Sequence, residues 1–516
     1  MPNARPQETE VLIVGAGPTG LVLAIWLARL GIRVRIVDRN AEPSATSRAL
    51  GVQARVLEMY NQLGLAGPVI AGGVRAEALN VWVGGKRATR LPITPIGRGM
   101  TPFPFVLIFP QDAHERLLVD HLVTLGVRVE RSVTVGGLTQ RDDGVDATLT
   151  RADGSTEDCS AQYVAGCDGA RSAVRQALGI GFPGATYSQY FYVADVQATG
   201  PTSNGEVHVA LDDADFLIVF PMTGAGRVRL IGVARDEGGR GDADVRFADV
   251  SHLALEHLGV HVDSVNWFST YHVHHRVASR FRDRRAFLLG DAAHIHGPVG
   301  GQGMNTGISD AINLAWKLAA VVRGRGSERL LDSYEPERIA FAQRLVATTD
   351  RLFTLATARG RVARFVRTHL VPRIAPLAVQ LPAVRRLMFR TVSQIWINYR
   401  RSALSAGTAG RVRGGDRLPW LPDVGGADNF APLASLDWQV HVYGEPPNAI
   451  QSGCRELGIP LHRFSWTAVA ERAGLLRGAL YLVRPDGYVA LADPHCDVGA
   501  LRRYVADWGL ATTNGS

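Results

Sequence analysis

The sequence has few cysteines for its length of 516 residues. There are only four, Cys159, Cys167, Cys454 and Cys496. They form neither a CxxC pair nor the spacing of a metal site, which excludes a disulfide scaffold, a zinc ribbon and a thioredoxin-type redox centre. Unpaired thiols are typical of a reducing compartment, so we expect a cytoplasmic protein.

Lysine is rarer still. All but two of the 56 basic residues are arginine, the exceptions being Lys86 and Lys317, and the formal net charge is +8. The arginines are scattered and form no compact basic block, so the sequence does not favour a nucleic-acid interface. We therefore expect no nucleic acid among the partners of this protein.

Long apolar runs are missing as well. No uninterrupted stretch of about 18 apolar residues occurs, and we therefore expect no membrane span. We also expect no signal peptide, because residues 1–10 are polar and the apolar stretch after them is broken by three glycines and a proline. Hydrophobic residues make up 46% and charged residues 20% of the chain, the balance of a globular protein. At about 150 residues per domain, the length predicts roughly three domains.

The first forty residues carry the first strong motif. An apolar run from Val11 to Val14 is followed by a glycine-rich turn, a helical pattern from Leu21 to Leu30, a second apolar run and an aspartate. This order predicts one βαβ unit. Glycines let the backbone approach a pyrophosphate, the helix N-terminus stabilises its charge, and the acid accepts bonds from a ribose hydroxyl. The dinucleotide-binding residues predicted here are Gly15, Gly17, Pro18, Gly20, Asp38 and Arg39.

A second glycine-rich segment lies much later in the chain. Residues 286–289 are apolar and lead into Gly290-Asp291, and a helix is predicted from about Thr306 to Val322. An aspartate at such a strand end can bond the polyol of a cofactor, and a glycine-rich stretch before a helix presents amides to an anion. For this segment alone, a helix cap followed by a plain loop stays open as the alternative.

A third segment, Tyr163 to Arg175, runs from a strand through Asp168-Gly169 into a helix, with a turn and a capped helix as its alternative. The three segments, in this order and spacing, resemble the class A, single-component FAD-dependent aromatic hydroxylases. That family includes p-hydroxybenzoate hydroxylase and the phenol-hydroxylase and polyketide-hydroxylase branch. In it the glycine turn holds the FAD diphosphate, the Asp-Gly segment serves flavin and NAD(P)H binding, and the Gly-Asp segment meets the ribityl chain.

The resemblance covers most of the chain and implies further site residues. Pro43 to Leu65, with Arg55 and Glu58, looks like the segment beside the isoalloxazine, and Phe109 to Leu118 looks like the one whose glutamine touches the ribityl region. The cofactor residues implied in the later segments are Arg48, Gln111, Asp168, Gly169, Gly290, Asp291, Pro298, Gly301, Gly303, Met304 and Asn305. Those implied nearest to the catalytic chemistry are Arg48, Pro298 and His294, and none is expected to be an obligate catalyst.

The predicted fold is α/β, a Rossmann-like FAD-binding domain with an inserted β-sheet substrate domain, a helical connector and a C-terminal thioredoxin-like domain. The expected boundaries are 1–80, 101–185 and 280–350 for the FAD-binding domain, 81–100 and 186–279 for the substrate domain, 351–404 for the connector and 405–516 for the thioredoxin-like domain. Four apolar runs within 186–279 predict an antiparallel sheet. Gly415 to Pro419 and Leu482 to Tyr488 resemble the extra domain of the phenol-hydroxylase branch, here without redox cysteines.

Two features of the sequence allow more than one interpretation. Arginines alternate with apolar residues in the connector, which favours helices on the FAD-binding domain but leaves a membrane-surface helix open. Five histidines cluster in sequence, at His272, His274, His275, His294 and His296. No carboxylate or thiol lies at a supporting interval, so no metal is predicted, and a role for one histidine beside the substrate stays open.

The resemblance implies an enzyme of bacterial secondary metabolism with non-covalent FAD, NADPH or NADH as co-substrate, and O2. In the family a flavin C4a-hydroperoxide attacks an electron-rich aromatic ring, here expected to be phenolic or polycyclic and polyketide-like. Pocket positions that suit a flat ligand, or equally a sheet core, are Phe103, Phe105, Phe191, Phe216, Phe220 and Met222. The alternatives are a flavin-dependent reductase or dehydrogenase, and a flavin-binding relative with a non-catalytic pathway role. We expect a monomer or a homodimer.

Overall fold

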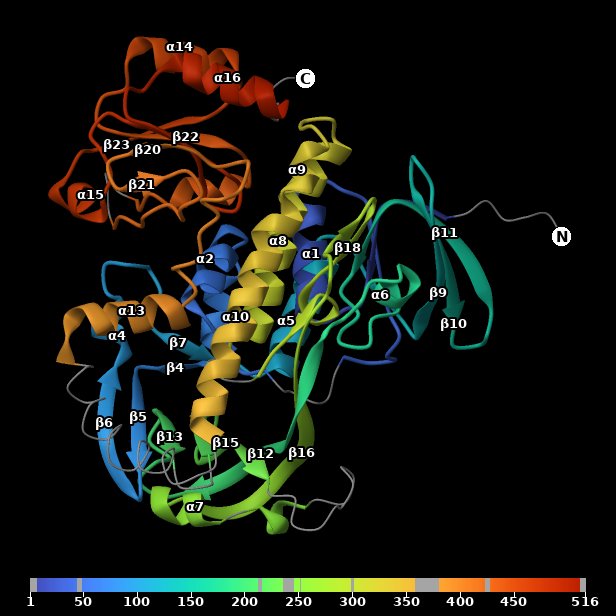
Figure 1. Ribbon diagram of the computed structural model, residues 1–516, viewed down its shortest axis with the longest axis vertical. Helices are drawn as coiled ribbons and strands as arrows, with labels where there is room; N and C mark the ends of the chain where they lie inside the picture. The colour runs from blue at the N-terminus through green and yellow to red at the C-terminus, as the bar shows by residue number, and fades with distance from the viewer. Residues whose placement is uncertain are drawn as a thin grey trace.

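Three regions follow one another along the long axis of the molecule. The computed structural model describes residues 7–43, 49–211, 216–234, 246–250, 252–297, 301–357, 380–422 and 427–510. Figure 1 shows a sheet region at one end, a central region around α1 and α8, and a smaller α/β unit at the other end. Two predicted site residues, Arg48 and Pro298, lie outside the described residues.

The central region is Rossmann-like. Its parallel strands have the order β18-β11-β1-β2-β8, with β9 and β10 as an antiparallel extension. Strand β1 reads as a continuous apolar run because Val11, Leu12 and Ile13 are buried on both faces of the sheet. The strands are β1 Gln7–Val14, β2 Val34–Asp38, β8 Val129–Arg131, β9 Val133–Gln140, β10 Val145–Arg151, β11 Thr156–Gly166, β17 Arg282–Asp283 and β18 Ala286–Leu288.

Helices and a small sheet complete this region. The longest helix with described side chains throughout is α8, whose apolar face packs against α1. The helices are α1 Pro18–Arg29, α2 Ala54–Gln62, α3 Ala66–Gly72, α5 Gln111–Thr124, α6 Ala173–Ala177, α8 Gly303–Val322, α9 Arg329–Asp332 and α10 Tyr334–Thr357, with the 3-10 turn η2 at Gly290–Ala292. The small sheet consists of β3 Gly51–Val52, β4 Val74–Ala76 and β7 Val106–Ile108.

The second region is an eight-stranded sheet of order β19-β16-β12-β15-β14-β13-β5-β6. The four strands predicted within 186–279, which are β12, β13, β14 and β15, pair antiparallel with one another as expected. The sheet as a whole is mixed, because β13 also pairs in parallel with β5, a strand about 130 positions earlier in the chain. The elements are β5 Ala78–Val83, β6 Lys86–Pro92, α4 Ile93–Gly97, β12 Gly184–Thr199, β13 Val207–Leu211, β14 Phe216–Pro221, β15 Arg227–Ala234, η1 Phe247–Asp249, α7 Leu253–Leu258, β16 His261–Val277 and β19 His294–Ile295.

The third region has the βαβαββα order of a thioredoxin-like fold. Strand β22 pairs in parallel with β23, and β24 pairs antiparallel with both β22 and β25. All four cysteines of the chain are free thiols buried in the structure. The elements are β20 Ala406–Ala409, β21 Val412–Arg413, η4 Ala431–Ser435, β22 Gln439–Tyr443, α14 Asn448–Glu456, β23 Leu461–Phe464, α15 Ala468–Ala473, β24 Leu480–Val483, β25 Val489–Asp493 and α16 Val498–Trp508.

The connector leads along the chain from α10 of the central region to the third region, and its described part includes the helix α13, Pro382–Val392. Proline stands at its first position, where the missing N–H costs nothing. None of the helices in the described ranges is long and apolar enough to span a bilayer.

Candidate functional site

The turn between β1 and α1 brings backbone, rather than side chains, to the edge of the sheet. Gly15 has a φ of 103°, and a Cβ at this position would lie 2.8 Å from the Cα of Asp168. Gly17 opens onto free space and caps α1 without a side-chain hydrogen bond. A helix N-terminus presented in this way carries amides and a partial positive charge toward an anion.

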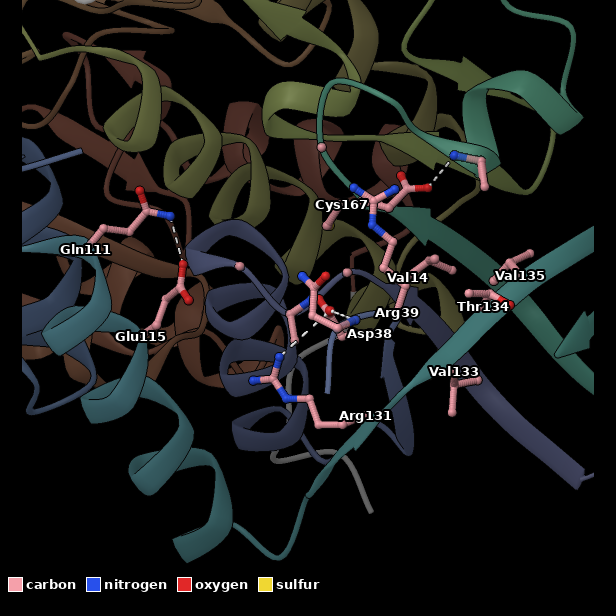
Figure 2. Close-up of a pocket in the computed structure, with 17 residues that line it drawn as sticks. Val14, Asp38, Arg39, Gln111, Glu115, Arg131, Val133, Thr134, Val135 and Cys167 are labelled. Atoms are coloured by element: carbon pink, nitrogen blue, oxygen red, sulfur yellow. Dashed lines mark hydrogen bonds and ion pairs between the residues drawn. The ribbon is translucent and has the colours of Figure 1, made fainter. Parts of the chain in front are cut away.

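A cavity of about 330 Å³ opens at this turn (Figure 2). The residues that line it come from the β1–α1 turn, the end of β2, the start of α5, the β8–β9 corner and the segment after β11. They are Val14, Gly15, Ala16, Gly17, Asp38, Arg39, Asn40, Gln111, Glu115, Arg131, Val133, Thr134, Val135, Cys167, Asp168, Gly169 and Ala173. Seven of the predicted cofactor residues are in this set: Gly15, Gly17, Asp38, Arg39, Gln111, Asp168 and Gly169.

Asp38 stands at the end of β2 and organises one wall of the cavity. Its Oδ2 accepts a hydrogen bond from the amide of Ala16 at 2.7 Å, and its Oδ1 accepts one from the amide of Asn40 at 2.8 Å. The Nη1 of Arg131 lies 3.8 Å from Oδ1 of Asp38, and Figure 2 marks this ion pair with a dashed line. A carboxylate has about four acceptor positions, so Asp38 retains capacity for the hydroxyls of a ribose.

Asp168 supports the opposite wall. Its Oδ2 accepts hydrogen bonds from the amides of Ala173 and Val174 at 2.6 and 3.2 Å, which caps α6 as the alternative reading of this segment expected. Burial raises the pKa of this carboxyl above its ordinary value. Its Oδ1, like the Nη2 of Arg131, is buried without a hydrogen-bond partner among the described residues.

Oδ1 of Asp168 and Nη2 of Arg131 are buried without hydrogen-bond partners among the described residues, and both residues line the same cavity. Two such atoms at one cavity indicate a polar ligand. A buried donor or acceptor left unpaired costs about 1–3 kcal/mol, which a bound ligand can recover. The glycine turn fits a diphosphate, Asp38 fits a ribose, and Val133 to Val135 supply an apolar wall suited to a flat base. The residues present therefore fit the adenosine diphosphate half of FAD.

Gln111 closes the cavity toward α5. Its Nε2 donates to Oε1 of Glu115 at 2.8 Å, and its Oε1 accepts from the amide of Ala49 at 3.2 Å. The side chain thus connects α5 to the segment just before β3, where the described residues resume at Ala49.

Six of the remaining predicted cofactor residues lie at the turn η2 and around the start of α8: Gly290, Asp291, Gly301, Gly303, Met304 and Asn305. Gly290 has a φ of 57° and Asp291 is exposed to solvent. A Cβ on Gly307 of α8 would lie 3.1 Å from the Cα of Gly290 and would clash with Thr19. This contact places η2 directly against the first turns of α1 and α8, although no residue of η2 or α8 is among those that line the cavity. Pro18 and Gly20 lie inside α1.

Asn305, one of the predicted cofactor residues, connects the start of α8 to the segment around β3. The Oδ1 of Asn305 accepts from the amide of Gln53 at 2.8 Å, and its Nδ2 donates to the carbonyls of Gly51 and Gly301 at 2.8 and 2.9 Å. Asn305 therefore fastens α8 to β3. Gly301, Gly303 and Met304 lie at this helix N-terminus, with Gly301 at a φ of 60°.

His294 is buried and does not line the cavity. Its Nε2 lies 2.7 Å from Oδ2 of Asp310, and its ring stacks on Phe281 at 5.8 Å. Asp310 also accepts the amide of Gly290 at 3.0 Å, so this pair holds the η2 turn. A catalytic role for His294 stays a prediction. No cluster that could hold a metal ion occurs within the ranges the structure describes.

The eight-stranded sheet has two different faces. On one, Leu217, Val219 and their neighbours pack against α7. On the other, fully buried Phe191 is surrounded by half-buried Phe216 and Phe220. Figure 1 shows α7 on the side away from α8 and α10, so the aromatic face points toward the central region. The rings of Phe103 and Phe105 meet edge to face in the central core, with their centroids 6.3 Å apart. Met222 is buried.

Sequence reasoning missed part of both sites. On the aromatic face it missed Trp267 and Tyr271, which lie on β16 beside Phe191. In the cavity it missed Arg131 and Val133 to Val135, which belong to a short strand and a corner without any motif. Alternation along β16 was the only signal that could have identified the first pair.

The fold and the site define a flavin-type dinucleotide-binding α/β protein. The FAD binding domain family matches residues 8–349. The 6-methylpretetramide 4-monooxygenase of Streptomyces rimosus is 37% identical over 513 residues, covering 93% of this chain and 90% of that protein. The chain therefore belongs to the family of FAD-dependent aromatic monooxygenases.

Two solved structures extend the comparison to the whole fold. Aklavinone-11 hydroxylase, in a ternary complex with FAD and aklavinone, matches with a TM-score of 0.78 and 26% identity, covering 98% of this chain and 100% of that one. The Diels-Alderase PyrE3 of pyrroindomycin biosynthesis matches with a TM-score of 0.77 and 27% identity over the same shares.

Proposed function

We propose that the protein uses FAD, NAD(P)H and O2 to hydroxylate a phenolic or polycyclic, polyketide-like aromatic substrate. The observation that carries the proposal is the pairing of a cavity fitted to adenosine diphosphate with a half-buried aromatic sheet face that points toward the same region. The 6-methylpretetramide and aklavinone named for the relatives are polycyclic, which supports a substrate of that class.

The chain supplies binding, orientation and electrostatics. The glycine turn and the N-terminus of α1 would hold the diphosphate of FAD, Asp38 would hold the ribose, and Asp291 on η2 is proposed as a partner of the ribityl chain. Bound FAD would supply the redox chemistry by accepting hydride from NAD(P)H and activating O2. The positive end of α8, a helix of 20 residues, stabilises negative charge developing in front of Gly303.

The other parts of the proposal concern the substrates. Phe191, Phe216 and Phe220 orient a flat ring and exclude water. NAD(P)H is proposed to visit the surface near Asp168 and the exposed Arg171, because FAD takes the dinucleotide site identified among the described residues. Arg48 and Pro298 are proposed next to the reacting ring of the flavin. The protein is proposed to be cytoplasmic and a monomer or homodimer.

Stopped-flow reduction of the FAD-loaded protein tests this function. NAD(P)H should reduce the flavin slowly alone and faster with a fitting phenol or polycyclic quinone from a panel. If no aromatic ligand accelerates flavin reduction, yet electrons pass rapidly from NAD(P)H to another acceptor, the protein is a reductase and not a hydroxylase.

A second candidate is a flavin-binding protein that does not oxygenate. The likeness to a Diels-Alderase over 98% of this chain favours it, because the same fold then serves a reaction without O2. Conversion of a pathway substrate by protein and FAD without NAD(P)H or O2 would identify this function.

A further inference from the structure

Two motifs of the C-terminal domain meet the FAD-binding domain at a buried junction that the cofactor site does not use. The first is the turn Arg484–Tyr488 between β24 and β25. Arg484 is fully buried, and its Nη1 and Nη2 donate to the carboxylate of Glu337 on α10 at 2.8 and 3.0 Å. Its Nε donates to Asp486 at 3.0 Å. The guanidinium of Arg484 thus lies between Asp486 of its own turn and Glu337 of α10, and it donates hydrogen bonds to both carboxylates.

Glu337 joins this turn to a second helix. The ammonium of Lys317 on α8 donates to Glu337 at 2.9 Å, and the hydroxyl of Ser402 donates to it at 2.7 Å. Arg484, Lys317, Glu337 and Asp486 balance one another in charge. A buried charge is tolerated only when it is paired and hydrogen-bonded, so each partner requires the others in place.

The same turn also holds α2. The carbonyl of Asp486 accepts from Nη2 of Arg55 at 2.6 Å, and the Arg55 guanidinium lies 4.8 Å over the ring of Tyr488. The second motif contributes Arg417, whose Nε donates to Glu58 at 2.8 Å. Two turns of the C-terminal domain therefore form hydrogen bonds with Arg55 and Glu58, the two charged side chains of α2.

The helices held at this junction carry the cofactor turns. The amide of Gln53, just before α2, donates to Asn305 at the start of α8. Arg338, the neighbour of Glu337, donates to Asp310, which accepts the amide of Gly290 at 3.0 Å. The junction is thus linked by one hydrogen bond, or two in series, to two segments of the proposed flavin site, η2 and the N-terminus of α8.

We propose that Arg484 is a positioning residue for the flavin site. By fixing α2, α8 and α10 in one register, the turn Arg484–Tyr488 holds η2 and the N-terminus of α8 ready for the cofactor. The C-terminal domain then serves flavin binding although it contributes no group to the cavity. The inference rests on the proposed FAD site and goes beyond it.

The variant Arg484→Lys tests this role, because it keeps the charge and removes the fork. Its control is Leu475→Ala, which opens a cavity in a cluster made only of C-terminal-domain residues. Both are compared well below their melting temperatures. We expect Arg484→Lys to raise the FAD dissociation constant at least tenfold and to speed amide hydrogen exchange at residues 289–295 in the apoprotein, with neither change in the control.

Equal FAD affinity and equal exchange in Arg484→Lys and Leu475→Ala would overturn the inference. Asp486→Asn provides a second variant with the same expected changes. A wild-type protein that binds no FAD would instead contradict the proposed function, so the two failures are distinguishable.

Native-state hydrogen exchange of the wild-type apoprotein in low denaturant needs no variant. We expect residues 289–295 and 303–305 to lose protection in the same opening step as residues 484–488. Opening of the C-terminal turn while both cofactor segments stay protected would refute the coupling.

Discussion

Asp38 offers the sharpest single test of the cofactor cavity. Two of its acceptor positions are occupied by the amides of Ala16 and Asn40, which leaves the others for the ribose hydroxyls. In Asp38→Asn the charge is lost and an NH2 group faces one of those amide donors. Hydrogen bonds to charged groups contribute about 1.5–3 kcal/mol, so FAD should bind roughly 10-fold to 150-fold more weakly.

Fluorescence titration of the apoprotein with FAD measures this change. The matched control is Asp153→Asn, because Asp153 also accepts the amide two residues later, at 2.9 Å from Ser155, but lies in an exposed turn outside the cavity. The control should bind FAD as the wild type does. A dissociation constant for Asp38→Asn within twofold of the control, with equal melting temperatures, would refute the assignment of Asp38 to the ribose.

Three further predictions follow from other parts of the structure. The purified protein should be yellow and release FAD on denaturation, and retention of flavin after denaturation would contradict the non-covalent assignment. Asp291→Ala should weaken FAD binding through loss of a ribityl hydrogen bond, by about 0.5–1.5 kcal/mol because Asp291 is exposed to solvent. Burial raises the pKa of Cys454 to about 11 and of Cys496 to about 12, so replacing both with Ser should leave turnover unchanged, whereas a large fall with folding intact would show a redox role. Burial lowers the pKa of His114 from 6.5 to about 3. Between these two pH values the folded state binds fewer protons than the unfolded state. The free energy of unfolding should therefore fall as the pH drops below 6.5, by up to about 1.4 kcal/mol per pH unit. Urea unfolding of His114→Phe between pH 7 and 5 should show a shallower loss than the wild type, and identical slopes would rule out this histidine as the cause.

The cofactor turns were predictable because their signals are local. Gly15, Gly17 and Asp38 stand within one βαβ unit, where backbone geometry and spacing determine that they lie together at one cavity, while their roles toward FAD stay a prediction. The same holds for Gly290 and the start of α8, since a strand, a turn and a helix follow one another there.

Long-range pairing was not predictable from one sequence. The parallel pairing of β13 with β5 joins segments about 130 positions apart, and nothing in either segment specifies its partner. The bonds from Arg484 to Glu337 cross 147 positions. Arg131 reaches the cavity only because β8 lies beside β2. Each depends on tertiary arrangement, which periodicity and turn residues do not encode.

The most direct test of the central claim is isotopic. The FAD-loaded protein is incubated with NAD(P)H, 18O2 and whichever phenol or polycyclic quinone accelerates flavin reduction, and the product is analysed by mass spectrometry. We expect one 18O atom per hydroxyl group introduced and none from 18O-labelled water. Turnover of that ligand to a product that carries no oxygen from O2 would contradict it.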